Sequence, residues 1–368
     1  PGHSLCYPKI VYNGILYFAA QNQSDNIELW RTDGTEVGTF MVKDISVDDS
    51  EPDDFVMCNG ILYFRAMNQS TKSAAYDNNE LWRSDGTESG TYLVKEIYFG
   101  DRGGYPNELT VYNDIVYFIA ADGLNGYELW RSDGTDVGTY IVKDLYPGTG
   151  LGASGGLIVY NDLLFFRGGN STIGLELYKT NGTEEGTELV IDLNTGGHSW
   201  PDNLIEMGGL LYFTANDGSI GEEFWRTDGN FVLKVKDLNP GPGNSLFAEP
   251  TILNGLLYFK ANNTLGLELW RSNGNQFGTY VLKDINVGNA SSSPTLFTPC
   301  NEYLYFRAND GIHDYELWRT DGTSLGTVLY KDINPSGSGY PDELASFNGI
   351  LYFAADDGSG VGEELWIC

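Results

Sequence analysis

The stretch Glu28-Leu-Trp-Arg-Thr-Asp-Gly-Thr-Glu-Val-Gly-Thr-Phe-Met-Val-Lys-Asp-Ile45 decides the fold, because the chain repeats it along its whole length. Its opening Glu-Leu-Trp step occurs eight times with small changes, ending at Trp30, Trp82, Trp130, Tyr178, Trp225, Trp270, Trp318 and Trp366. Successive copies lie 45 to 52 residues apart. A period of this length is typical of a repeat architecture.

Each repeat contains four short runs rich in Val, Ile, Leu and aromatic residues. In the first repeat the second run contains Leu16-Tyr17-Phe18, and the fourth is Val42-Lys-Asp-Ile45. Asn-Gly, Asn-Asp or Asp-Gly pairs bound the runs, which predicts four strands joined by tight turns. We expect Asp33-Gly34 and its equivalents to form two-residue hairpin turns, because glycine adopts a positive φ without strain.

The repeats predict an all-β protein, a single eight-bladed β-propeller of four-stranded antiparallel blades over residues 1–368. The predicted repeats are approximately 6–51, 52–105, 106–152, 153–200, 201–248, 249–293, 294–340 and 341–368. The first three strands occur eight times, but the fourth occurs seven times, since the sequence stops two residues after Trp366. We therefore expect the last blade to lack its outer strand, and the tryptophans to fill the gaps between blades.

The full pattern at Glu28–Ile45, and its close copy at Glu128–Leu145, resembles the ELWxxDGT repeat family. The resemblance covers nearly the whole chain. It implies a secreted, surface or adhesion-associated protein and brings no set of catalytic residues. Repeats four to six depart from the pattern, with Tyr178 in place of Trp and with Asn181 and Asn273 in place of Asp.

The formal net charge of −30 disfavours nucleic acid as a partner, because a phosphate backbone needs a positive surface. Thirteen of the 21 basic residues occupy two repeat positions, the one after Glu-Leu-Trp and the Lys of the fourth strand. We interpret them as structural ion-pair ladders. No apolar run approaches the roughly 20 residues that a membrane helix needs. We interpret the start at Pro1 as that of a mature, processed chain.

Six Asn-x-Ser/Thr sequons predict N-linked glycans and an extracellular location, secreted or at the cell surface. They begin at Asn22, Asn68, Asn170, Asn181, Asn262 and Asn289. Four of them fall between the second and third strands of a repeat, and Asn289 follows a fourth strand. Those connections share one face of a propeller. The alternative is that polar loops produce such tripeptides by composition.

Four cysteines in an extracellular chain suggest disulfides: Cys6, Cys58, Cys300 and Cys368. Cys58 and Cys300 occupy equivalent places at the end of a first strand, and the alternative for them is a free buried thiol. A bridge between Cys6 and Cys368 looks strained, because strand direction places them on opposite faces. An intermolecular bridge through a terminal cysteine remains open.

Acidic loops are candidate calcium sites, because calcium takes 6–8 oxygen ligands. The candidates are Asp48, Asp49, Glu51 and Asp53 in one loop, and Asp122, Asp217, Asp310 and Asp357 in hairpins between second and third strands. Asp-Gly pairs also serve simply to turn a hairpin. The sequence predicts no other cofactor.

The chain predicts no enzyme, since its three histidines are scattered and none stands beside a repeated Ser or Cys. A weaker alternative is a pocket enzyme that uses the central channel. We favour a non-enzymatic extracellular structural glycoprotein, a propeller module that self-assembles, with head-to-tail filaments as one form of the assembly. The principal alternative is a glycan-binding or adhesive, lectin-like propeller, with calcium and with loop aromatics such as Trp200 and Tyr340 stacking on sugar rings.

Overall fold

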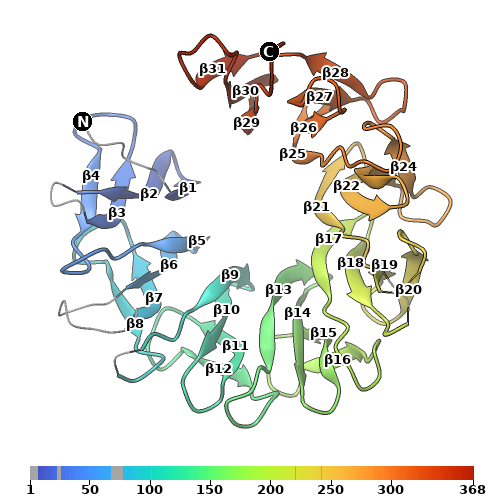
Figure 1. The fold of residues 1–368 in the computed structure, drawn as a ribbon. Coiled ribbons are helices and arrows are strands. Elements are labelled where there is room, and N and C mark those ends of the chain that lie inside the picture. The colour runs from blue at the N-terminus through green and yellow to red at the C-terminus, as the bar shows by residue number, and fades with distance from the viewer. Residues whose placement is uncertain (1–6, 23–25, 68–77, 101, 220, 242) are drawn as a thin grey trace. The chain divides into compact units, whose positions relative to one another are not determined.

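The computed structural model describes residues 7–22, 26–67, 78–100, 102–219, 221–241 and 243–368 (Figure 1). Every regular element in these ranges is a β-strand, and helices are absent from them. The chain divides into two compact units, the first ending at Asp192 and the second beginning at Leu193. Each unit carries four blades, numbered 1 to 8 in chain order.

The first unit contains four sheets of four strands each, in which consecutive strands pair antiparallel. Blade 1 comprises β1 (Tyr7–Tyr12), β2 (Ile15–Gln21), β3 (Ile27–Thr32) and β4 (Phe40–Lys43). Blade 2 comprises β5 (Asp53–Cys58), β6 (Ile61–Met67), β7 (Asn79–Ser84) and β8 (Tyr92–Lys95). Blade 3 comprises β9 (Asn107–Tyr112), β10 (Ile115–Ala121), β11 (Tyr127–Ser132) and β12 (Tyr140–Lys143). Blade 4 comprises β13 (Ala153–Tyr160), β14 (Leu163–Asn170), β15 (Gly174–Thr180) and β16 (Glu188–Ile191).

The second unit contains three such sheets and one of three strands. Blade 5 comprises β17 (Asp202–Met207), β18 (Leu210–Asn216), β19 (Glu222–Thr227) and β20 (Val232–Lys236). Blade 6 comprises β21 (Ala248–Leu253), β22 (Leu256–Asn263), β23 (Gly266–Ser272) and β24 (Tyr280–Lys283). Blade 7 comprises β25 (Thr295–Cys300), β26 (Tyr303–Asn309), β27 (Tyr315–Thr320) and β28 (Val328–Lys331). Blade 8 comprises β29 (Asp342–Phe347), β30 (Ile350–Ala355) and β31 (Glu364–Ile367).

The two-residue hairpin turns lie between the first and second strands, not at the Asp-Gly pairs. Asn13 (φ 48°) and Gly14 (φ 76°) both adopt the left-handed region that a type I′ turn requires. Asp33-Gly34 instead opens the longer loop between β3 and β4, in which Asp33 accepts hydrogen bonds from the backbone and hydroxyl groups of Thr35. The expectation of two-residue turns at Asp-Gly was therefore wrong, because the following Thr-x-x-Gly-Thr segment belongs to the loop.

The hydrophobic core lies between neighbouring blades within each unit. One cluster joins Tyr17, Leu29 and Val42 of blade 1 to Leu62, Phe64, Ala66 and Trp82 of blade 2. Equivalent clusters join blades 2 and 3, 3 and 4, 5 and 6, 6 and 7, and 7 and 8. Each blade thus has a leading face, which packs against the preceding blade, and a trailing face, which packs against the following one. The prediction that tryptophans fill the gaps between blades is confirmed for Trp82, Trp130, Trp270, Trp318 and Trp366.

The fold class is confirmed: the protein is an all-β, eight-bladed β-propeller whose last blade has three strands. The Glu-Leu-Trp step or its variant lies on the third strand of every blade, and a Lys ends each fourth strand except β16, which ends at Ile191. That the eight blades form a single domain remains a prediction.

Candidate assembly surface on the last blade

Blade 8 ends at an unpaired strand edge. β31 pairs with β30 along one side, and the pairing extends to Cys368, whose N–H donates to the carbonyl of Leu351 at 3.0 Å. Among the described residues no strand pairs with the other edge of β31. An unpaired edge offers a row of backbone donors and acceptors to another strand.

The complete blades show what a fourth strand and its loop contribute. The Arg of the third strand donates to the carbonyl of the Asp-Gly turn in the following blade, as in Arg31 to Gly86 and Arg271 to Gly322. The fourth-strand Lys also reaches the following blade, where Lys283 donates to the carbonyl of Thr327 at 2.7 Å. Within each unit, these cations therefore hydrogen-bond a blade to the one that follows it.

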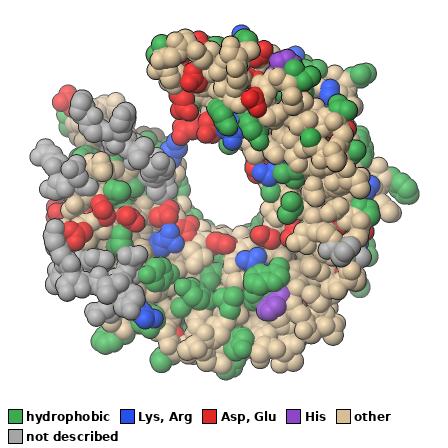
Figure 2. All heavy atoms as spheres, viewed as in Figure 1, with side chains coloured by type: hydrophobic (Ala, Val, Ile, Leu, Met, Phe, Trp, Pro, Cys, Tyr) green, Lys and Arg blue, Asp and Glu red, His purple; other side chains and the backbone are tan. Residues whose placement is uncertain are grey.

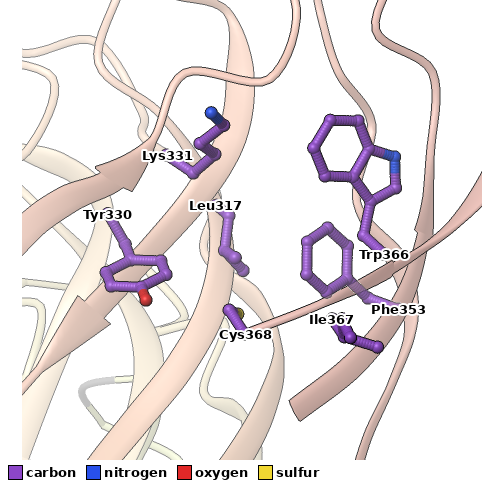
Figure 3. Close-up of a pocket in the computed structure, with 7 residues that line it drawn as sticks. All are labelled: Leu317, Tyr330, Lys331, Phe353, Trp366, Ile367 and Cys368. Carbon is purple, nitrogen blue, oxygen red and sulfur yellow. The ribbon is translucent and has the colours of Figure 1, made fainter.

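Blade 7 has these cations, but blade 8 has no fourth-strand loop in the described chain to receive them. Lys331 lies 6.0 Å from the centre of the Trp366 ring, and Arg319 packs between the rings of Tyr303 and Tyr330. A cleft of about 370 Å³ opens here (Figure 3), lined by Leu317, Tyr330, Lys331, Phe353, Trp366, Ile367 and Cys368. The cleft lies between β27 and β28 of blade 7 and the strands β30 and β31 of blade 8.

The trailing face of blade 8 is apolar and exposed. Leu365 is 76% exposed, whereas its equivalent in blade 7, Leu317, is completely buried. Phe347 is 66% exposed, whereas its equivalent Cys300 is buried. Ile367 replaces the Arg of the other blades and is also exposed. These residues, with Ile350 and Tyr352, form the blade 8 trailing face.

Charge surrounds this apolar face. Asp342 and Glu343 on β29 are exposed, and Figure 2 shows acidic side chains gathered on the last blade. Glu364 lies only partly buried on β31. In the complete blades the equivalent glutamates are fully buried.

Those buried glutamates are a repeated feature that we did not single out from the sequence. Each organises the connection to the next blade: Glu80 accepts hydrogen bonds from the backbone N–H groups of Ile97, Tyr98 and Gly104. Burial raises the pKa of Glu80 to about 7, although these hydrogen bonds oppose the shift. The available signal was the Glu that recurs beside the apolar residues of the third strand in every repeat.

The predicted ion-pair ladders are largely absent from the described residues. Lys143, Lys236 and Lys283 donate to backbone carbonyls of the next blade instead of binding acids. Ion pairs at the predicted positions include Lys95 with Asp136 at 2.9 Å and Lys179 with Glu188 at 3.3 Å. For Lys143, Lys236 and Lys283 the predicted partner was wrong, because the next blade presents carbonyl groups there.

The predicted glycosylation sites differ in accessibility. Asn289 and Asn181 are exposed, although the Asn181 side chain accepts hydrogen bonds from Thr183. Asn22, Asn170 and Asn262 are partly buried, and Asn68 lies outside the described residues. Glycosylation at all six sites remains a prediction.

Three of the four predicted disulfide cysteines are free thiols: Cys58 and Cys300 are buried, and Cys368 is exposed. Burial, and to a lesser degree the neighbouring Cys300, raises the pKa of the Cys368 thiol. Disulfide pairing among the four cysteines remains a prediction. Cys6 lies outside the described residues.

The candidate calcium ligands in the hairpins are engaged by their own turns. Asp122 accepts backbone hydrogen bonds from Leu124 and Asn125, Asp310 from Ile312 and His313, and Asp357 from Ser359. Burial alone would raise the pKa of Asp217. Hydrogen bonds from Ser219 and Lys234 outweigh burial and lower this pKa to about 2.

In the acidic loop, which also holds Asp48 and Glu51, Asp49 accepts a hydrogen bond from the N–H of Ile27, and Asp53 pairs with Arg65 at 2.7 Å. Within the described ranges, no group of three or more His, Cys, Asp or Glu residues is arranged to hold a metal ion. Calcium binding remains a prediction.

The loop aromatics of the lectin hypothesis stack on their neighbours. Trp200 lies 5.2 Å from the His198 ring, and Tyr340 lies 5.6 Å from the Tyr315 ring, centre to centre. Both adopt a positive φ, 48° and 45°, which is rare for aromatic residues. Each remains about half exposed.

Comparison with known proteins supports the fold alone. No family model matches the chain, and no curated protein matches it. A prolyl endopeptidase, studied for inter-domain dynamics in catalysis and specificity, is 12% identical with a TM-score of 0.52, and the match covers 97% of this chain and 55% of that one. A puromycin-hydrolysing peptidase of Mycobacterium tuberculosis is 11% identical with a TM-score of 0.48, covering 96% and 57%.

The β-propeller domain of the Trilobed protease from Pyrococcus furiosus is 11% identical with a TM-score of 0.44, covering 86% of this chain and 95% of that domain. The chain spans just over half the length of the first two peptidases. Within the described part of the chain, no helix has the length and apolar character needed to cross a membrane.

Proposed function

We propose that this protein is a non-enzymatic, extracellular structural glycoprotein of the ELWxxDGT repeat type that assembles with copies of itself. The observation that carries the proposal is the edge of β31 in blade 8, with which no strand of the described residues pairs. An unpaired edge of this kind is a ready template for pairing with another chain.

The equivalent face of every other blade in the second unit supports this proposal. Leu317 and Leu269 occupy the position of Leu365 and are completely buried. Burying a Leu side chain stabilises a contact by about 1.5–3 kcal/mol. A surface that exposes several such side chains therefore gains free energy when another protein surface covers it.

The test is the mass of the purified protein as a function of concentration, measured by sedimentation velocity. The proposal predicts assemblies that grow with concentration and that Leu365→Asp abolishes. Val361→Asp is the matched control, because Val361 is equally exposed but lies in the loop before β31. A wild-type protein that stays monomeric at every concentration contradicts the proposal.

The second candidate function is glycan binding, favoured by the half-exposed, stacked pairs Trp200–His198 and Tyr340–Tyr315. Arg307 lies over both tyrosine rings and adds a hydrogen-bond donor beside them. Saturation-transfer NMR with a panel of glycans tests this function. Signals that Tyr340→Ala removes would support it, and no transfer from any glycan would contradict it.

A further inference from the structure

Cys300 and Cys368, both in the second unit, approach the same residue, Leu351. Cys300 ends β25 and belongs to the hydrophobic cluster between blades 7 and 8, which also contains Leu351. Cys368 follows β31, and its N–H and carbonyl exchange hydrogen bonds with Leu351 at 3.0 and 2.9 Å. Side chains that face each other across an antiparallel pair lie on the same face of the sheet, about 5 Å apart. The Cys368 side chain is therefore directed into the interface where Cys300 is buried.

Two further observations place Cys368 against blade 7. Cys368 lines the cleft of about 370 Å³ together with Leu317, which is a member of the same hydrophobic cluster as Cys300 (Figure 3). Burial is the main cause of the raised pKa of the Cys368 thiol, and Cys300 is a further cause. The two sulfur atoms are thus neighbours across one interface.

The repeats show that these two positions also meet in other blades. Met207 of blade 5 is the equivalent of Cys300, and its terminal methyl group lies 3.4 Å from where a Cβ of Gly274 would stand in blade 6. Gly274 comes two residues after Ser272, the equivalent of Cys368. The end of a first strand therefore reaches the end of the third strand in the following blade.

The interface between blades 7 and 8 also differs from the others in what joins it. Arg226 and Lys236 of blade 5 donate to carbonyl groups in the loop before the fourth strand of blade 6. In the described residues no such loop follows β31, so Arg319 and Lys331 of blade 7 have no equivalent acceptors on blade 8. A covalent bond would secure β31 where these hydrogen bonds are missing.

We propose that Cys300 and Cys368 form a disulfide that ties the third strand of blade 8 to blade 7. One thiolate attacks an oxidised low-molecular-weight disulfide, such as glutathione disulfide, and the other thiolate then attacks the mixed disulfide. The bond between the two cysteines forms, and two small thiols leave with the two thiol protons. The inference does not depend on the proposed self-assembly, and the oxidising surroundings of an extracellular protein would preserve the bond.

Peptide mapping of the purified full chain tests the pairing. The folded, dilute protein is incubated with glutathione disulfide, its remaining thiols are alkylated, and it is digested with trypsin without reduction. Cleavage after Lys and Arg places the four cysteines on four separate peptides, 1–9, 44–65, 284–307 and 332–368. Mass spectrometry of the monomer should find 284–307 joined to 332–368. Reduction should separate the two peptides, and Cys300→Ala should abolish the joined product.

Thermal unfolding gives a second readout. The oxidised wild type should melt about 5 °C above the reduced protein, because the bond closes a long loop in the unfolded chain. Cys368→Ser should melt at the same temperature under both conditions. Cys58→Ala is the matched control, since Cys58 is buried at the equivalent position of blade 2, and it should keep the wild-type difference.

Blade 3 allows the same geometry to be built on purpose. Cys58 shares a hydrophobic cluster with Val116, and Val116 is paired across the strands with Ser132, the equivalent of Cys368. Oxidised Ser132→Cys should therefore join the peptide 44–65 to the peptide 132–143. Circular dichroism verifies that each variant is folded.

Four results would overturn the inference. The first is a folded, oxidised wild type in which Cys300 and Cys368 both remain open to alkylation. The second is a bond from either of them to Cys6 or Cys58, and the third is a bond found only between two copies. The fourth is an unlinked Cys58 in folded Ser132→Cys, which would refute the geometric argument. The proposed self-assembly is decided separately, by sedimentation.

Discussion

The two leucines Leu317 and Leu365 offer a direct test of blade packing, because they occupy the same repeat position on β27 and β31. Leu317 is completely buried in the cluster between blades 7 and 8, whereas Leu365 is exposed. Leu→Ala in a packed core costs about 2–5 kcal/mol, through lost transfer free energy and the cavity left behind. Surface substitutions usually change the free energy of unfolding by less than about 0.5 kcal/mol.

We therefore expect Leu317→Ala to destabilise the protein by about 3 kcal/mol and Leu365→Ala by less than about 0.5 kcal/mol. Urea unfolding followed by tryptophan fluorescence measures both. With a slope of roughly 3 kcal/mol per molar urea, Leu317→Ala should lower the midpoint by about 1 M. Protein concentration must be low enough to keep the wild type monomeric. An equal loss for the two variants under that condition would refute the reasoning, because Leu365 would then be covered within a single molecule.

Three further predictions concern pH, the glycine contacts and the glycans. Burial raises the pKa of Glu80 from 4.5 to about 7, so its contribution to the free energy of unfolding is fully present below about pH 4.5 and is lost as the pH rises through 7. In thermal unfolding measured against pH, Glu80→Gln should remove about 3 kcal/mol of this pH dependence, and an unchanged profile would contradict the shift. Gly86→Ala should destabilise more than Gly34→Ala in urea unfolding of the monomer, because both glycines have a positive φ but only Gly86 meets a tyrosine hydroxyl; equal losses would show that backbone strain alone matters. Protein secreted from a eukaryotic host should lose mass on treatment with peptide-N-glycosidase, and Asn289→Gln should remove one glycan, which intact-mass spectrometry would detect; an unaltered mass would exclude a glycan at this exposed site.

The sequence predicted the blades because each carries its own local signal. Asn13-Gly14 turns a hairpin through its own backbone preferences, and the alternation around Trp30 places one face of β3 against a neighbour. The missing fourth strand of blade 8 followed from counting repeats. These features depend on residues close in the chain.

The contacts between blades were harder to predict, because they join residues about 50 positions apart. The sequence showed that Arg31 and Lys283 recur, but it did not show that their acceptors are the carbonyls of Gly86 and Thr327. A backbone acceptor has no side-chain signature. The exposure of Leu365 was equally hidden, since its sequence motif matches that of the buried Leu317.

The most direct test of the account is a structure of the assembled protein, determined by electron cryo-microscopy, that resolves the surroundings of β31. The account predicts that a neighbouring copy contacts the edge of β31 that is unpaired among the described residues. An edge covered by another part of the same chain, or a neighbouring copy that contacts only other surfaces, would contradict it.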